Sequence, residues 1–133
     1  MGTSLFQTIF SFIVLFVPFQ VQNFDSFEDI ASYLKESDSR NIAAYFAPLI
    51  EMNILNEENE YSKAQAELIL RDFLLKNKPS TVKILHQLNS NSNYRFAVFS
   101  FQGIDKKFRI SISMAKEGDS FTIKVIRIEY DKE

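Results

Sequence analysis

The apolar residues after position 26 recur with the period of an α-helix. They predict a helix over 27–34 and, after a polar break at Ser37–Ser39, a second and shorter helix. The second helix is expected to end near Ala47, because Pro48 disfavours a helical conformation in the residue before it. The apolar stripes of the two helices consist of Phe27, Ile30, Ala31 and Leu34, and of Ile42, Ala43 and Phe46.

The next segment changes from a strand to a helix. Alternating apolar and polar residues predict a half-buried strand over Leu49–Ile54, and the acidic run Asn56–Glu60 predicts a turn. Ser62 and Gln65 have the spacing of a capping box in front of a third helix. This helix is expected to end at residues 77–79. The apolar stripe of this helix consists of Ala66, Ile69, Leu70, Phe73 and Leu74.

From Thr81 onward the apolar period falls to two residues, which is the period of β-strands. Consecutive strands with short connections pair antiparallel. The pattern therefore predicts an α+β fold, in which N-terminal helices lie against one face of a curved antiparallel sheet with four consecutive C-terminal strands. These strands are expected at Thr81–Leu88, Tyr94–Phe101, Lys107–Met114 and Phe121–Tyr130.

The four strands carry apolar residues on both faces of the predicted sheet. In Lys107–Met114 every second residue, beginning with Phe108 and Ile110, is apolar. These residues are expected to face the helices. The neighbouring strands have a further apolar set on the other face, unless a β-bulge resets the register of the last strand. Such a face predicts either an interface, most simply with a second copy, or burial inside a strongly curved sheet. The interface candidates are Phe99, Phe101, Ile126, Ile128 and Tyr130.

The first 24 residues contain no charged side chain, and 5–21 are rich in Phe, Ile, Val and Leu. This apolar run contains polar residues, ends near Pro18 and is shorter than the roughly 20 residues of a membrane-spanning helix. It predicts a signal peptide over 1–23 and one exported domain over 24–133. The alternative is a retained hydrophobic helix, which would be the only part to contact a membrane. The start Met1–Ser4 lacks the usual basic residue, and no small-residue cleavage motif places the cut.

Composition removes several classes of function. The chain has no cysteine, which excludes disulfides and a lipid anchor on cysteine. Its net charge of −2 comes from interspersed charges of both signs, without the basic stripe of a nucleic-acid-binding protein. No zinc-ligand spacing, calcium loop, phosphate-binding loop or nucleophile motif occurs in the sequence. We therefore predict no catalytic residue, no metal and no cofactor.

The single histidine, His86, is the one side chain that suggests proton transfer. It shares strand parity with Val82 and Ile84, so it is expected to point toward the helix-covered face. There it would be either a general base or a hydrogen-bonded core residue. Tyrosines that place a hydroxyl at the edge of an apolar pocket would accompany it. The pocket candidates are His86, Tyr33, Tyr45 and Tyr94.

The order helix, helix, strand, turn, helix and four strands resembles the nuclear transport factor 2-like (cystatin-like) superfamily. Residues 54–87, ILNEENEYSKAQAELILRDFLLKNKPSTVKILHQ, resemble a small bacterial family known as domain of unknown function 4783. The resemblance implies a cone, with a sheet wrapped around a long helix, often with a pocket and often dimeric through the sheet. It also implies export in Gram-negative bacteria, to the periplasm or the medium. It implies no activity, and Glu51 has the parity of a solvent-facing residue rather than of an inward catalytic carboxylate.

Three functions remain open at this point. The first is an exported, non-catalytic binding module whose cone holds a small apolar ligand or whose sheet face binds a partner. The second is a proton-transfer enzyme, similar to an isomerase or dehydratase, that uses His86 in the cone. The third is a structural subunit that acts by forming a homodimer.

Overall fold

The structure is a computed structural model, and it describes Ile13 and residues 27–132. The predicted signal peptide therefore lies, except for Ile13, outside the described residues. Among the described residues, no helix combines the length and the apolar character that crossing a membrane requires.

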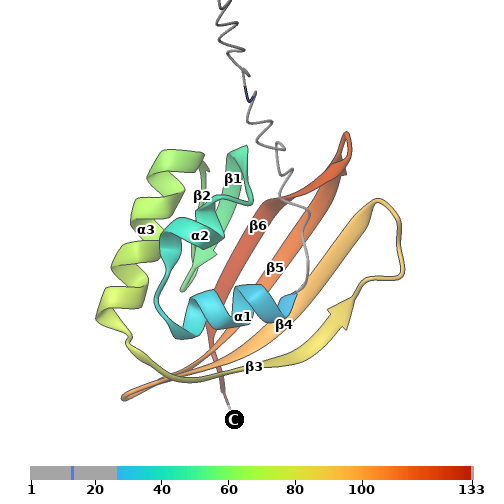
Figure 1. Cartoon of the computed structure of the whole chain (residues 1–133). Helices are drawn as coiled ribbons and strands as arrows, with labels where there is room; N and C mark the ends of the chain where they lie inside the picture. Colours follow the sequence, from blue (N-terminus) through green and yellow to red (C-terminus); the bar gives the residue numbers. More distant parts are fainter. Residues whose placement is uncertain (1–12, 14–26, 133) are drawn as a thin grey trace, which may run out of the picture.

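Residues 27–132 form helices that lie on one face of a single sheet (Figure 1). The strand order in the sheet is β2-β1-β6-β5-β4-β3, so the last strand of the chain lies between β1 and β5. In chain order the elements are α1 (Phe27–Lys35), α2 (Ser39–Ala43), β1 (Phe46–Ile54), β2 (Glu57–Ser62), α3 (Lys63–Lys76), β3 (Pro79–Leu88), β4 (Tyr94–Gly103), β5 (Lys107–Glu117) and β6 (Ser120–Tyr130).

The second helix is shorter than the sequence predicts. Asp38 caps α2 by accepting a hydrogen bond from the Asn41 backbone N–H at 3.1 Å. The helix ends at Ala43, and Phe46, which was predicted to be helical, is the first residue of β1. The Ile123 N–H of β6 donates to the Tyr45 carbonyl at 2.6 Å. This contact between distant parts of the chain draws the segment into the sheet before the helix can continue.

The acidic run that was predicted as a turn is instead an edge strand, β2, which pairs antiparallel with β1. The turn between them consists of Leu55 and Asn56 alone, both with positive φ, at 51° and 77°. Two consecutive residues with positive φ are typical of a type I′ hairpin. Leucine rarely adopts this conformation, so the sequence gives little sign of the turn.

Strands β3 to β6 pair antiparallel in chain order, as predicted. The sheet is nevertheless mixed, because β1 adds to β6 in parallel. The β1–β6 register shifts between Phe46 and Glu51, a stretch that includes Pro48. Proline has no N–H to donate to a neighbouring strand, which suits an irregular stretch of the ladder.

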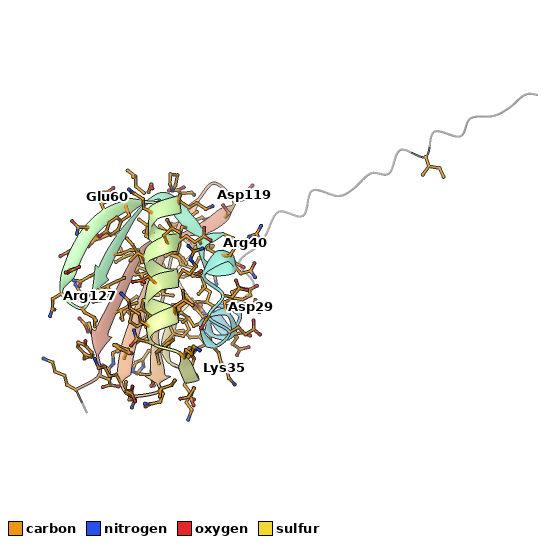
Figure 2. All side chains as sticks on the ribbon, turned by 90° about the vertical axis from the view of Figure 1, so that its left-hand side faces the viewer. Asp29, Lys35, Arg40, Glu60, Asp119 and Arg127 are labelled. Carbon is orange, nitrogen blue, oxygen red and sulfur yellow. The ribbon has the colours of Figure 1, made fainter. Side chains whose placement is uncertain are left out.

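Helix α3 begins at the predicted capping box. The Gln65 backbone N–H donates to Ser62 Oγ at 3.3 Å, and the Ser62 backbone N–H donates to Gln65 Oε1 at the same distance. Near the other end of the helix, the Phe73 ring packs 5.0 Å from Phe108 and 5.8 Å from Phe101, measured between ring centroids. Figure 2 shows α3 in front of the sheet and Arg127 of β6 at the side away from α1 and α2. The core thus lies between the helices and one face of the sheet.

The predicted outward orientation of Phe99, Phe101, Ile126 and Ile128 is wrong, since all four are buried in the core. Phe99 pairs with Ile110 and Phe101 pairs with Phe108, and residues directly opposite each other share a face. In β6 a bulge at Lys124 shifts the register, so Ile123 and Ile126 both face the helices. Tyr130, at the end of the sheet, is the one interface candidate that is exposed.

Candidate functional site

His86 does not face the helices, because a second bulge changes the parity of β3. The β3–β4 register shifts between Ile84, which pairs with Phe99, and His86, which pairs with Val98. His86 is exposed and shares the outer face of the sheet with Val98. The prediction of an inward His86 is therefore wrong, and the cause is one extra residue in the strand.

The three candidate tyrosines lie in separate places. Tyr33 is half-buried on α1, and Tyr45 is buried just before β1. Tyr94 is exposed at the start of β4, where its hydroxyl donates to Ser113 Oγ at 3.4 Å. The structure does not bring the four pocket candidates together, and none of them lines the three hollows described below.

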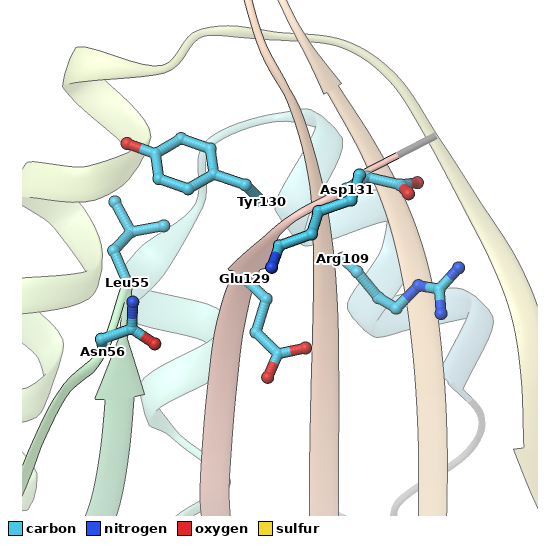
Figure 3. A pocket seen from close by; sticks show the side chains of 7 residues that line it. Leu55, Asn56, Arg109, Glu129, Tyr130 and Asp131 are labelled. Atoms are coloured by element: carbon cyan, nitrogen blue, oxygen red, sulfur yellow. The ribbon is translucent and has the colours of Figure 1, made fainter.

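The largest of these hollows, about 490 Å³, lies where β6 ends (Figure 3). Its lining residues are Leu55, Asn56, Arg109, Glu129, Tyr130, Asp131 and Lys132. Much of this charge already has a partner, since Asp131 pairs with Lys107 at 3.5 Å and Glu129 pairs with Arg127 at 3.6 Å. Figure 3 shows the Arg109 guanidinium turned away from the Glu129 carboxylate. The hollow is a broad surface depression whose lining is mostly polar and charged.

A second hollow, of about 240 Å³, separates α3 from the β1–β2 hairpin on the helix-covered face, and we call it the α3 cleft. Met52 and Phe73 of its lining are buried, and Ile54 and Ile69 are half-buried. Leu55 belongs to this cleft and to the larger hollow, so the two are neighbours. The full lining is Met52, Ile54, Leu55, Glu57, Tyr61, Ile69, Asp72, Phe73, Lys76 and Asn77.

Polar groups surround the mouth of the α3 cleft. Lys76 Nζ lies 2.9 Å from Asp72 Oδ2, one helical turn away, and both side chains are largely exposed. Asn77 ends the helix, and its side-chain amide donates to the Phe73 carbonyl at 3.1 Å. The apolar stripe on α3 predicts Ile69 and Phe73 as inward residues. The opposite wall was missed, because β2 was read as a turn.

The third hollow, about 420 Å³, lies between the α3–β3 connection and the β4–β5 turn. It shares Lys76 and Asn77 with the α3 cleft, so the α3 cleft adjoins both of the other hollows.

The outer face of the sheet carries an acidic group on β1 and β2. Glu51 pairs in register with Glu60, and the neighbouring Asn53 pairs with Glu58. A side-chain hydrogen bond with Glu58 and the negative charges of Glu58 and Glu60 raise the pKa of Glu51, which Arg127 opposes. Within residues 27–132, no three His, Asp or Glu side chains are grouped as a metal site.

Solved structures share this arrangement of helices and sheet. A DUF4783 family protein from Bacteroides uniformis ATCC 8492 matches with a TM-score of 0.75 and 22% identity, over 80% of this chain and 97% of that one. A cystatin-like domain of unknown function from Nostoc punctiforme matches with a TM-score of 0.63 and 8% identity, over 80% and 74% of the chains. A designed NTF2 protein with a long sheet matches with a TM-score of 0.60 and 16% identity, over 76% and 94%.

These similarities confirm the predicted α+β fold and the resemblance to the cystatin-like and nuclear transport factor 2-like folds. At these identities they bear on the fold alone. No curated protein matches the chain. The model of the family described as Domain of unknown function (DUF4783) matches residues 27–129, which is almost the whole described domain. The chain therefore belongs to the DUF4783 family.

Proposed function

We propose that the protein is a non-catalytic binding module whose α3 cleft receives the apolar part of a small amphipathic ligand. The lining of the cleft carries this proposal, because Met52, Ile54, Ile69 and Phe73 form an apolar interior beneath a charged mouth. Small-molecule sites typically combine a mostly apolar lining with a few polar groups that fix the orientation of the ligand.

The size of the α3 cleft limits what it can hold. An engineered apolar cavity of about 150 Å³ in another protein binds benzene, and drug-sized ligands occupy roughly 300–1,000 Å³. The α3 cleft, at about 240 Å³, lies between these values. We therefore expect it to accept a single ring or a short aliphatic chain, with the rest of the ligand outside.

The mouth of the cleft carries one cation, Lys76, which can bind the acidic end of a ligand, beside the carboxylates of Asp72 and Glu57. Lys76 is exposed and pairs only with the exposed Asp72 in the same helix, and such surface pairs contribute little to stability. A ligand carboxylate can replace Asp72 beside Lys76 at small cost. A short fatty acid such as octanoate combines this carboxylate with an aliphatic chain of suitable width.

Titration with octanoate, followed by the methyl NMR signals of the protein, tests this proposal. We expect saturable shifts of the Met52, Ile54 and Ile69 methyl groups. Ile69→Trp fills the cleft and should abolish saturable binding. Leu68→Trp adds the same ring at an exposed position of α3 and should leave binding unchanged. Undiminished binding by Ile69→Trp, or an absence of shifts in the wild-type protein, would reject the proposal.

A homodimer is a second candidate, favoured by apolar side chains on the outer face of the sheet. Phe96 and Val98 of β4 are half-buried there, close to the exposed Leu88 and Tyr94. Specific dimers commonly bury about 1,200–2,000 Å² in total. Light scattering over a range of concentrations tests this candidate, because Val98→Glu should convert a dimer into a monomer. A wild-type protein that stays monomeric throughout would exclude it.

We further propose that the domain is exported, in the Gram-negative manner, to the periplasm or the medium. The support is the charge-free apolar segment in front of the domain. Fractionation of cells that express the full chain should recover a shortened protein outside the cytoplasm. Recovery of the full-length protein in the membrane fraction would support the retained helix instead.

A further inference from the structure

The hollow between the α3–β3 connection and the β4–β5 turn shares Lys76 and Asn77 with the α3 cleft, but its other side chains have no part in the binding-module proposal. Both segments lie at the lower end of the molecule in Figure 1. We call this surface the turn face. It consists of Leu75, Lys76, Asn77, Lys78, Ile104, Asp105 and Lys106.

Two apolar side chains project from the turn face. Leu75 is 64% exposed and Ile104 is 72% exposed, more than any other large apolar residue of 27–132. Ile104 is held at the tip of a tight hairpin, since the Gly103 N–H donates to the Lys106 carbonyl at 2.8 Å. A Cβ at position 103 would lie 3.0 Å from that oxygen, so a larger residue there would press on the Lys106 carbonyl. The apolar groups are therefore fixed at the outermost points of this surface.

The charge of the turn face is positive, although the whole chain has a net charge of −2. Lys76, Lys78 and Lys106 are all exposed, and Asp105 is the only acid in the lining. Asp72, next to the lining, pairs with Lys76 at 2.9 Å, so Lys78 and Lys106 supply most of the positive charge. Lys106 Nζ also lies 5.6 Å from the ring centroid of Tyr130, which is itself exposed. The two apolar tips are thus surrounded by cationic groups.

We propose that the turn face docks on a lipid bilayer that contains anionic lipids. Leu75 and Ile104 would enter the boundary between headgroups and acyl chains, and the lysines would lie among the phosphates. A groove for an acidic peptide would hold its apolar residues at the bottom, whereas here they are the most exposed ones. This inference does not rest on a ligand in the α3 cleft.

Vesicle co-sedimentation tests the inference with residues 24–133, because the apolar N-terminal segment could bind vesicles on its own. The match with the Bacteroides uniformis structure covers 97% of that chain, so a single domain of this size forms the fold on its own. Circular dichroism confirms the fold of each variant. We expect binding to vesicles of phosphatidylcholine mixed with phosphatidylglycerol, little binding to phosphatidylcholine alone, and release at high salt.

Two double variants separate the charge from the apolar tips. Each lysine near an anionic surface contributes about fivefold in affinity, so Lys78→Gln with Lys106→Gln should weaken binding about 25-fold. Leu75→Ser with Ile104→Ser should weaken it about tenfold through the lost apolar contact. The matched control, Lys63→Gln with Leu68→Ser, changes the same residue types elsewhere on α3 and should bind like the wild type.

Equal binding by all three variants, or no binding by the wild type, would overturn the inference. Retention on immobilised polyglutamate without binding to anionic vesicles would also overturn it, and would identify an acidic polypeptide as the occupant. Because none of the substituted residues lines the α3 cleft, octanoate titration of the same variants shows separately whether the binding-module proposal holds.

Discussion

The helix-covered face of the sheet has two halves that are filled differently. Under α1 the rings of Phe27 and Phe99 meet edge to face at 6.1 Å between their centroids. Beside the β1–β2 hairpin, the smaller Met52, Ile54 and Ile69 leave the α3 cleft open. The same sheet thus supports a sealed half, which holds the fold together, and an open half, which has room for a ligand.

Truncating Phe99 should have the largest effect, because this residue belongs to the sealed half. Phe99→Ala removes a fully buried ring and should lower the free energy of unfolding by about 3–5 kcal/mol. Val98→Ala, in the same strand but on the outer face, should cost clearly less, and urea denaturation measures both. Similar losses for the two variants would mean that the α1 half is not the main source of stability.

Two adjacent residues of α3 allow the stability contribution of a sealed position to be compared with that of a position at the open cleft. Leu70 is buried and Ile69 is half-buried at the cleft. Leu70→Ala should cost about 2–5 kcal/mol, while Ile69→Ala should cost only about 1 kcal/mol because its neighbours already leave space. The midpoints of thermal unfolding rank the two variants. If Ile69→Ala proved the more damaging, the cleft would have to be closed in solution.

The capping box at the start of α3 ties the helix to β2, and so to the open half. Ser62→Ala removes the hydrogen bond from the Gln65 N–H and should cost about 1 kcal/mol. Amide hydrogen exchange should rise first in the opening turn of α3 and in β2, and later in β4 and β5. A uniform rise across the sheet would show that the two halves unfold as one unit.

Removing the negative charge of Glu51 should have the smallest effect, on the outer face beside the open half. Its pKa is raised from 4.5, so the folded protein binds this proton more tightly than the unfolded chain does. The associated stability is present below 4.5 and is lost as the pH rises through the raised value. Glu51→Gln should therefore raise the melting temperature at neutral pH and flatten its fall between acidic and neutral pH. Glu36→Gln, an exposed residue after α1, is the control and should do neither.

Local sequence patterns were enough to predict α3 and the four C-terminal strands. The Ser62–Gln65 capping box and the apolar stripe with Leu70 are local signals, and they mark the helix correctly. In β5 strict alternation identified the buried face. Each of these features depends on neighbours within a few positions of the chain.

The errors arose where one residue or a distant partner decides the outcome. The bulges in β3 and β6 each add one residue, which moved His86 outward and brought Ile126 inward. The turn between β1 and β2 contains no glycine, although Leu55 has a positive φ. The sequence therefore did not reveal the hairpin, and β2 was predicted to be a turn. The wall that β2 adds to the α3 cleft was missed for the same reason. The parallel pairing of β1 with β6 joins segments about half the chain apart and leaves no local pattern.

The position of β6 also affects how the protein is made. Among residues 27–132, strand β6 (Ser120–Tyr130) alone joins the β1–β2 hairpin to the β5–β4–β3 part of the sheet. Until the ribosome has synthesised these residues, the two pieces cannot join, and the hydrophobic core between them cannot close. A nascent chain of this design therefore cannot close its core before β6 has been synthesised.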